Sequence, residues 1–156
     1  GISAAVGMAL SAKHFGDSFK VYAVLGDGEI EEGQVWEAAM FAGNKGLSNL
    51  TAFVDYNNLQ IDGTIEEVNS AAPIDKKFEA FGWHVITIDG HSFEEIENAL
   101  KEAETADKPV AIIAKTVKGK GVSFMENAVG WHGSAPNDEQ YEQAMTELNA
   151  ALAALN

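Results

Sequence analysis

Residues Gly26–Gly63 read GDGEIEEGQVWEAAMFAGNKGLSNLTAFVDYNNLQIDG, and this stretch decides the fold. Asn57 comes 30 residues after Asp27, an interval that fits a strand, a crossover helix and a second parallel strand. Because the carboxyl ends of parallel strands meet at one edge of a sheet, Asp27 and Asn57 are expected to lie close together there. A carboxylate and an amide oxygen, beside exposed glycine amides and a helix N-terminus, suit a hard cation that carries a diphosphate.

The rest of the chain alternates between apolar strand patterns and helical patterns. Strands are expected at 21–25, 50–54, 84–88 and 110–114. Helices are expected at 4–15, from 31 or 32 to about 45, at 75–81, over 92–103 after a capping-box pattern, and from Asn137 or Asp138 onward. Residues 60–73 show no clear periodicity and are expected to form an irregular loop. This order predicts an α/β fold, a parallel sheet with helices on both faces in a three-layer α/β/α sandwich.

Two apolar helix patterns are assigned to packing, and Phe93 begins a further helical stripe over 92–103. Trp36, Met40 and Phe41 are expected in the core or at a subunit interface. The stripe from Tyr141 to Leu155 is also expected to pack, and not to form a groove for a partner.

Composition limits the classes of function. The chain has 156 residues, enough for one domain, and a formal net charge of −14 from 10 basic and 24 acidic side chains. That charge argues against nucleic acid or an anionic membrane as a partner, because both select basic surfaces. The absence of cysteine excludes disulfides and thiol chemistry, and no apolar run approaches the roughly 20 residues of a membrane span. A cytoplasmic location is therefore expected.

The Gly26–Gly63 segment resembles the thiamine diphosphate motif, in which Gly-Asp-Gly precedes an asparagine by about thirty residues. Its neighbouring residues are similar to those of transketolases in particular. The matching blocks are Glu32-Gly33, Val35–Ala38, Asp55–Asn57, Lys115–Gly121 and Trp131–Gly133 with Pro136. The resemblance covers essentially the whole chain. It implies transfer of a two-carbon ketol unit between ketose and aldose phosphates, with thiamine diphosphate and Mg²⁺ or Ca²⁺ as cofactors.

The resemblance also implies roles for individual residues. The implied metal ligands are Asp27, Asn57 and the Leu59 carbonyl; the implied cofactor contacts are Gly26, Asp27, Gly28, Asn57, Lys118 and His132; the implied catalytic residues are His132, Glu32 and Glu37. In the family, acidic residues like the last two link the two cofactor sites of a dimer.

Several of these residues also have ordinary structural interpretations. Taken alone, Asp27 is a turn aspartate and His132 a surface histidine. Glu32 and Glu37 are carboxylates that the dipole of a helix N-terminus favours. His91 is assigned to a turn.

In transketolases the cofactor lies between a diphosphate-binding domain and a pyrimidine-binding domain of the opposing subunit. Residues 1–156 are expected to form a single diphosphate-binding domain, incomplete at its N-terminus, without the pyrimidine-binding and C-terminal domains. Such a chain would be a fragment, or the small subunit of a split transketolase. It would work only in a homodimer or hetero-oligomer with a pyrimidine-binding partner.

Three other functions remain open at this point. They are a deoxyxylulose phosphate synthase, the decarboxylating component of a 2-oxo acid dehydrogenase, and a non-catalytic interaction module that keeps the fold. The Glu32–Ala38 pattern and Trp131–Gly133 favour transketolase over the first two.

Overall fold

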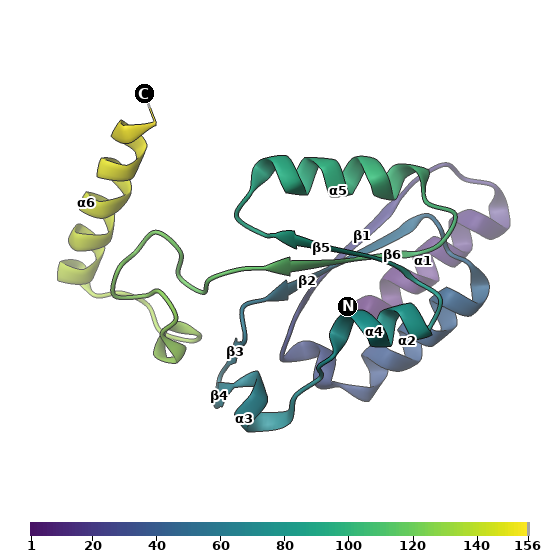
Figure 1. The fold of residues 1–156 in the computed structure, drawn as a ribbon, viewed down its shortest axis with the longest axis horizontal. Coiled ribbons are helices and arrows are strands. Elements are labelled where there is room, and N and C mark those ends of the chain that lie inside the picture. Colours follow the sequence, from purple (N-terminus) through teal and green to yellow (C-terminus); the bar gives the residue numbers. More distant parts are fainter. Residues whose placement is uncertain (156) are drawn as a thin grey trace.

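A four-stranded parallel sheet organises the computed structural model, which describes residues 1–155. Its spatial order is β1 (Val21–Gly26), β2 (Leu50–Tyr56), β6 (Val110–Lys115) and β5 (His84–Asp89). All three strand pairs are parallel, so the four carboxyl ends meet at one edge of the sheet (Figure 1).

Helices cover both faces of this sheet, which confirms the expected three layers. Helices α1 (Ile2–Phe15), α2 (Gly33–Lys45) and α4 (Ile74–Ala80) pack on one face, and α5 (Phe93–Thr105) packs on the other (Figure 1). The central strand β6 is buried from Val110 to Ala114, as expected for a parallel strand covered on both sides. Ala111 and Ile113 face the three-helix layer, while Val110 and Ile112 face α5.

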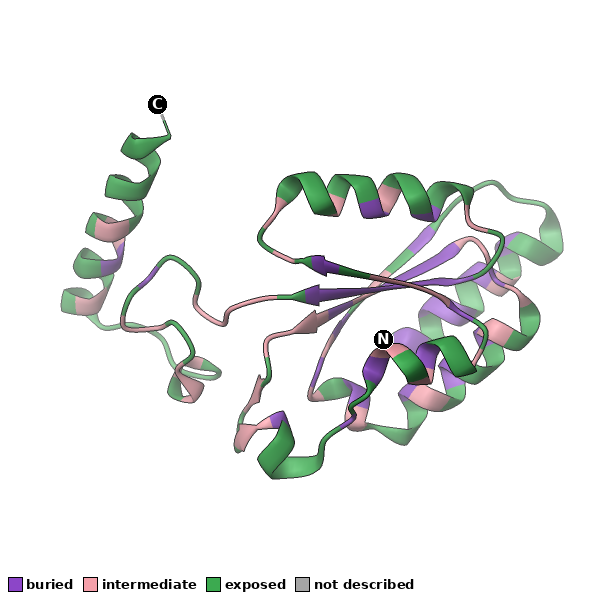
Figure 2. Cartoon of the chain, in the orientation of Figure 1, coloured by how far each residue is buried: buried purple, intermediate pink, exposed green. Residues whose placement is uncertain are grey.

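The α5 layer leaves the edge strand β1 uncovered on its side of the sheet. Tyr22 is 53% exposed and Val24 74% exposed, although their neighbours Val21 and Leu25 are buried (Figure 2). The sheet therefore has a complete core on one face and an open apolar margin on the other.

The segment from 60 to 73 differs from its expected irregular loop. It contains strand β3 (Leu59–Gln60), strand β4 (Gly63–Thr64) and the short helix α3 (Ile65–Asn69). The Thr64 hydroxyl accepts from the backbone N–H of Glu67, and the Glu67 carboxylate accepts from the Thr64 N–H at 3.2 Å. This reciprocal capping box starts a helix too short to show periodicity in the sequence.

The other expected helix starts hold with small changes. A short 3-10 helix, η1 (Glu29–Glu31), precedes α2, and Glu32 is the N-cap of α2. Asn137 caps the last helix, α6 (Asp138–Ala154). The Ser92 hydroxyl accepts from Glu95 N–H, but the Glu95 carboxylate accepts from the Asp89 N–H at the end of β5, not from Ser92.

The apolar stripe of the last helix does not pack as expected. Helix α6 lies away from the sheet, and its only buried residue is Ala144, while Tyr141 and Leu148 are 53% and 42% exposed (Figures 1 and 2). Phe93 is 88% exposed. On α2, Trp36 packs against the core, as expected, while Met40 and Phe41 are exposed in this chain, so their place at a subunit interface stays a prediction. A helical stripe marks an apolar face without showing what covers it. None of the helices within residues 1–155 has the length and apolar content to cross a bilayer.

The Glu147 carboxylate links helix α6 to the loop after β6, and its hydrogen bonds should weaken in acid. Glu147 accepts from the backbone N–H and the hydroxyl of Ser123, each at 2.7 Å, and from Gln143. These hydrogen bonds lower the pKa of Glu147, and the bond from the Ser123 backbone N–H has the largest effect. The ionised carboxylate therefore stabilises the folded protein. This stabilisation is complete above the ordinary glutamate pKa of about 4.3, and it is lost as the pH falls through the lower pKa of the folded state.

We therefore expect the Ser123 amide proton resonance to move as the pH falls below about 4. In Glu147→Gln this titration should disappear, whereas Glu139→Gln on the same helix should keep it. A Ser123 resonance that stays constant from neutral pH to pH 3 would contradict the assignment.

Candidate functional site

The carboxyl edge of the sheet carries a cleft of about 430 Å³ between the ends of β1 and β2 and the loop after β6. Seven of the nine residues assigned from the sequence line it: Gly26, Asp27, Gly28, Asn57, Leu59, Lys118 and His132. The parallel register therefore brings together residues from three separate parts of the chain.

Asp27 is the buried acid of this cleft, with only 2% of its surface exposed. Its carboxylate accepts hydrogen bonds from the backbone N–H of Gly28 at 2.9 Å and from that of Asn58. Burial raises the pKa of Asp27, and the charge of Asp55 adds to this effect, while the backbone hydrogen bonds oppose it. No basic side chain within residues 1–155 forms an ion pair with Asp27.

The turn after β2 wraps around this carboxylate. Asn58 adopts a left-handed conformation with φ of 63°, which asparagine tolerates better than most residues, and its N–H donates to Asp27. The Asn57 side-chain oxygen accepts from the Leu59 N–H at 3.0 Å, and the Asn57 amide nitrogen donates to Asp55 at 3.4 Å. Asp27, after β1, and Asn57, after β2, thus lie on two neighbouring turns, as the spacing of the motif predicts.

The oxygen atoms at these two turns fit a hard divalent cation. Each carboxylate oxygen of Asp27 accepts one backbone hydrogen bond and keeps further lone-pair capacity, as does the amide oxygen of Asn57. Within residues 1–155 there is no cluster of three or more acidic, histidine or cysteine side chains that could hold a metal by itself. A cation here would need amide, carbonyl and ligand oxygens, which is how Mg²⁺ usually binds together with phosphates.

Gly28 leaves room for the Gln60 side chain in the cleft wall. A Cβ atom at this position would lie 3.1 Å from the Gln60 Cβ and 3.2 Å from its side-chain oxygen. Gln60 is held in place because its amide nitrogen donates to Glu31 at 2.9 Å. Gln60 is a wall residue that the sequence pattern did not indicate, because it lies in the segment expected to be irregular.

Lys118 and His132 supply the basic side of the cleft. The Lys118 Nζ lies 3.3 Å from the His132 Nδ1. The loop that carries both is pinned by a hydrogen bond from Asn127 N–H to the Lys118 carbonyl at 2.9 Å and by one from the Trp131 indole to the Phe124 carbonyl at 2.9 Å. Both side chains can therefore donate to an anion that enters the cleft.

Glu32 and Glu37 do not lie in this cleft. Both are exposed, on the N-cap and in the first half of α2, and the Glu32 side chain makes no capping hydrogen bond. Their assignment as catalytic residues stays a prediction.

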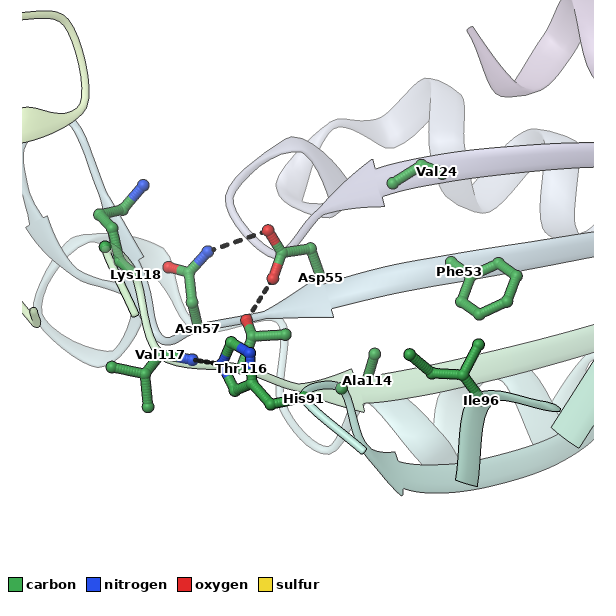
Figure 3. A pocket seen from close by; sticks show the side chains of 12 residues that line it. Val24, Phe53, Asp55, Asn57, His91, Ile96, Ala114, Thr116, Val117 and Lys118 are labelled. Carbon is green, nitrogen blue, oxygen red and sulfur yellow. Dashed lines mark hydrogen bonds between the residues drawn. The ribbon is translucent and has the colours of Figure 1, made fainter. Parts of the chain in front are cut away.

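A second hollow, of about 460 Å³, adjoins the cleft and includes residues that the sequence analysis did not assign (Figure 3). His91 lies in a turn, as expected, but its ring nitrogen Nε2 also accepts from the Val117 N–H at 2.7 Å (Figure 3). The Thr116 hydroxyl donates to Asp55. No local pattern signals these contacts, because they join segments that lie far apart in the sequence.

Comparison with known proteins agrees with this geometry. Residues 1–151 match the family model described as transketolase, thiamine diphosphate binding domain. The chain is 48% identical over 149 residues to a 6-deoxy-6-sulfo-D-fructose transketolase subunit of Clostridium sp. (strain MSTE9), covering 95% of this chain and 54% of the relative. It is 42% identical over 153 residues to an apulose-4-phosphate transketolase subunit of Phocaeicola vulgatus, covering 97% and 54%.

A solved structure shows the same fold. The transketolase of Campylobacter jejuni superposes with a TM-score of 0.90 and 34% identity, over 94% of this chain and 24% of that one. The chain thus spans about half the length of the subunit relatives and about a quarter of that transketolase.

Proposed function

This chain belongs to the family of transketolase thiamine diphosphate-binding domains, and we propose that it binds the diphosphate group of thiamine diphosphate, with its metal ion, within a transketolase. The reaction would transfer a two-carbon ketol unit between ketose and aldose phosphates. The observation that carries the proposal is Asp27, a buried carboxylate without a basic partner in residues 1–155, which lines the same cleft as Asn57, whose side-chain oxygen can also ligate a metal.

In this proposal Asp27, Asn57 and the Leu59 carbonyl bind Mg²⁺, for which Ca²⁺ could substitute. The cation offsets the buried charge of Asp27, whose pKa is raised by burial in the absence of any such partner. Gly28, which lines the cleft next to Asp27, would contact the diphosphate through its backbone.

Lys118 and His132 act from the loop after β6, which also lines the cleft. Lys118 donates to the diphosphate, and His132, whose Nδ1 lies 3.3 Å from the Lys118 Nζ, donates to the diphosphate or to a donor hydroxyl. Thiamine diphosphate, when bound, supplies the nucleophilic carbon that accepts the ketol unit.

We further propose that residues 1–156 belong to one diphosphate-binding domain and that another domain or subunit binds the pyrimidine ring. Two of the relatives named above are subunits of transketolases, which supports a partner chain in a homodimer or hetero-oligomer. Glu32 and Glu37, exposed on α2, would then link cofactor sites across the interface. Without the partner, the chain is expected to lack ketol transfer activity.

A calorimetric titration with thiamine diphosphate tests this function. With a transketolase pyrimidine-domain subunit supplied, binding should depend on Mg²⁺ and disappear when the metal is chelated. Absence of binding in the presence of both Mg²⁺ and the partner would overturn the proposal.

The donor substrate separates transketolase from the related activities. The assembled protein should consume a ketose phosphate and leave pyruvate and other 2-oxo acids untouched. Consumption of a 2-oxo acid would instead indicate a deoxyxylulose phosphate synthase or a dehydrogenase component. Assembly that neither Mg²⁺ nor cofactor affects would indicate an interaction module.

A further inference from the structure

Asp55 is a partly buried carboxylate at the end of β2 to which no role in the site has been given. It lies between the side chains of Asn57, which follows β2, and Thr116, which follows β6 (Figure 3). One of its oxygens accepts from the hydroxyl of Thr116, which follows β6, and the other accepts from the Asn57 amide nitrogen at 3.4 Å. Asp55 therefore connects the end of β6 to one of the proposed metal ligands.

This contact determines which way the Asn57 amide points. With its nitrogen directed at Asp55, the Asn57 oxygen lies on the other side of the amide and accepts from the Leu59 N–H at 3.0 Å. A flipped amide would place its oxygen against the Asp55 carboxylate and its nitrogen against a backbone N–H. Both contacts would be repulsive, so Asp55 and the Leu59 N–H hold the Asn57 oxygen on the side of the amide away from Asp55.

Thr116 is itself held by the neighbouring strands. Its backbone N–H donates to the Tyr56 carbonyl at 3.2 Å, and the next N–H, of Val117, donates to the His91 ring at 2.7 Å. Its methyl group fills the space beside Gly90, where a Cβ atom would come within 2.5 Å of it. The Thr116 hydroxyl is thus aimed at Asp55 by contacts on both sides of β6.

We propose that Thr116 and Asp55 are positioning residues that orient the Asn57 amide oxygen for the cation bound with the diphosphate. This inference rests on the proposed function, because it assumes that the cleft holds Mg²⁺. Partners of metal ligands act in this way in other proteins, and their loss costs roughly 10–100-fold in metal affinity.

The decisive variant is Thr116→Val, which keeps the shape of the side chain and replaces only the hydroxyl with a methyl group. Thr116→Ser keeps the hydroxyl, and Thr87→Val makes the same change at an exposed position of β5, outside the cleft and the adjoining hollow. Should Thr116→Val fail to fold, Asp55→Asn tests the same link, because its amide offers one acceptor oxygen instead of two.

Two measurements are made on each variant. In the ligand-free protein, the side-chain amide resonances of Asn57 should shift in Thr116→Val and stay in place in Thr116→Ser and Thr87→Val. In the assembly with its pyrimidine-domain partner, Thr116→Val should need roughly tenfold more Mg²⁺ for half-maximal thiamine diphosphate binding. A merely structural role would leave the Mg²⁺ requirement unchanged.

The two measurements separate this inference from the proposed function. Unshifted Asn57 resonances in Thr116→Val, or a native Mg²⁺ requirement, would overturn the positioning role alone. If the native assembly binds no thiamine diphosphate in the presence of Mg²⁺, the proposed function and this inference both fail.

Discussion

Replacing Asp27 with alanine is expected to abolish Mg²⁺-dependent binding of thiamine diphosphate. Asp27 is the only charged side chain among the three proposed metal ligands, and it is 2% exposed. Removing a charged partner from a buried pair costs about 3–5 kcal/mol, which corresponds to a loss of at least about 100-fold in affinity. The substitution also leaves the backbone N–H groups of Gly28 and Asn58 without the acceptor that orders the turn.

Calorimetric titration of the assembly, with and without Mg²⁺, measures this loss. Asp27→Asn separates charge from shape, because it preserves the size of the side chain, and it should bind nearly as poorly as alanine. Asp17→Ala, at an exposed position beyond α1, removes the same charge far from the cleft and should bind normally. Far-ultraviolet circular dichroism shows whether each variant is folded. If folded Asp27→Ala retained native Mg²⁺-dependent affinity, the metal site would be wrongly placed.

Replacing Gly43 with alanine is expected to destabilise the fold strongly. Gly43 lies in α2, where the helix meets the turn that leads into β5, and a Cβ atom would come within 1.8 Å of the Phe81 carbonyl oxygen. The turn cannot move aside easily, because the Trp83 indole donates to the Ala39 carbonyl at 2.8 Å and its ring packs against Phe78. We expect a loss of about 3 kcal/mol or more in the free energy of unfolding.

Urea unfolding of Gly43→Ala and Gly7→Ala gives a matched comparison. Gly7 lies in α1, and a Cβ atom there would meet nothing within 4 Å. Alanine at position 7 should therefore stabilise the protein by up to about 1 kcal/mol, through its better helix propensity. Equal stabilities of the two variants would show that the close approach of α2 to the turn does not matter for folding.

The sequence alone was sufficient for the framework and for the main residues of the cleft. Apolar runs and helical patterns are local signals, and they located the four sheet strands and most of the helices. The parallel order then implied that the residues after β1 and β2 meet, because parallel strands end at one edge. For this reason the juxtaposition of Asp27 and Asn57 could be predicted from their spacing.

Only the tertiary structure decided which side chains support that cleft and which apolar surfaces are covered. The Thr116–Asp55 and Val117–His91 contacts join positions 61 and 26 residues apart, and no local pattern encodes them. The close approach at Gly43 is likewise invisible until α2 and the turn before β5 are placed together. The stripe on α6 predicted burial, yet the helix lies off the sheet, because periodicity defines a face while only packing decides what the face meets.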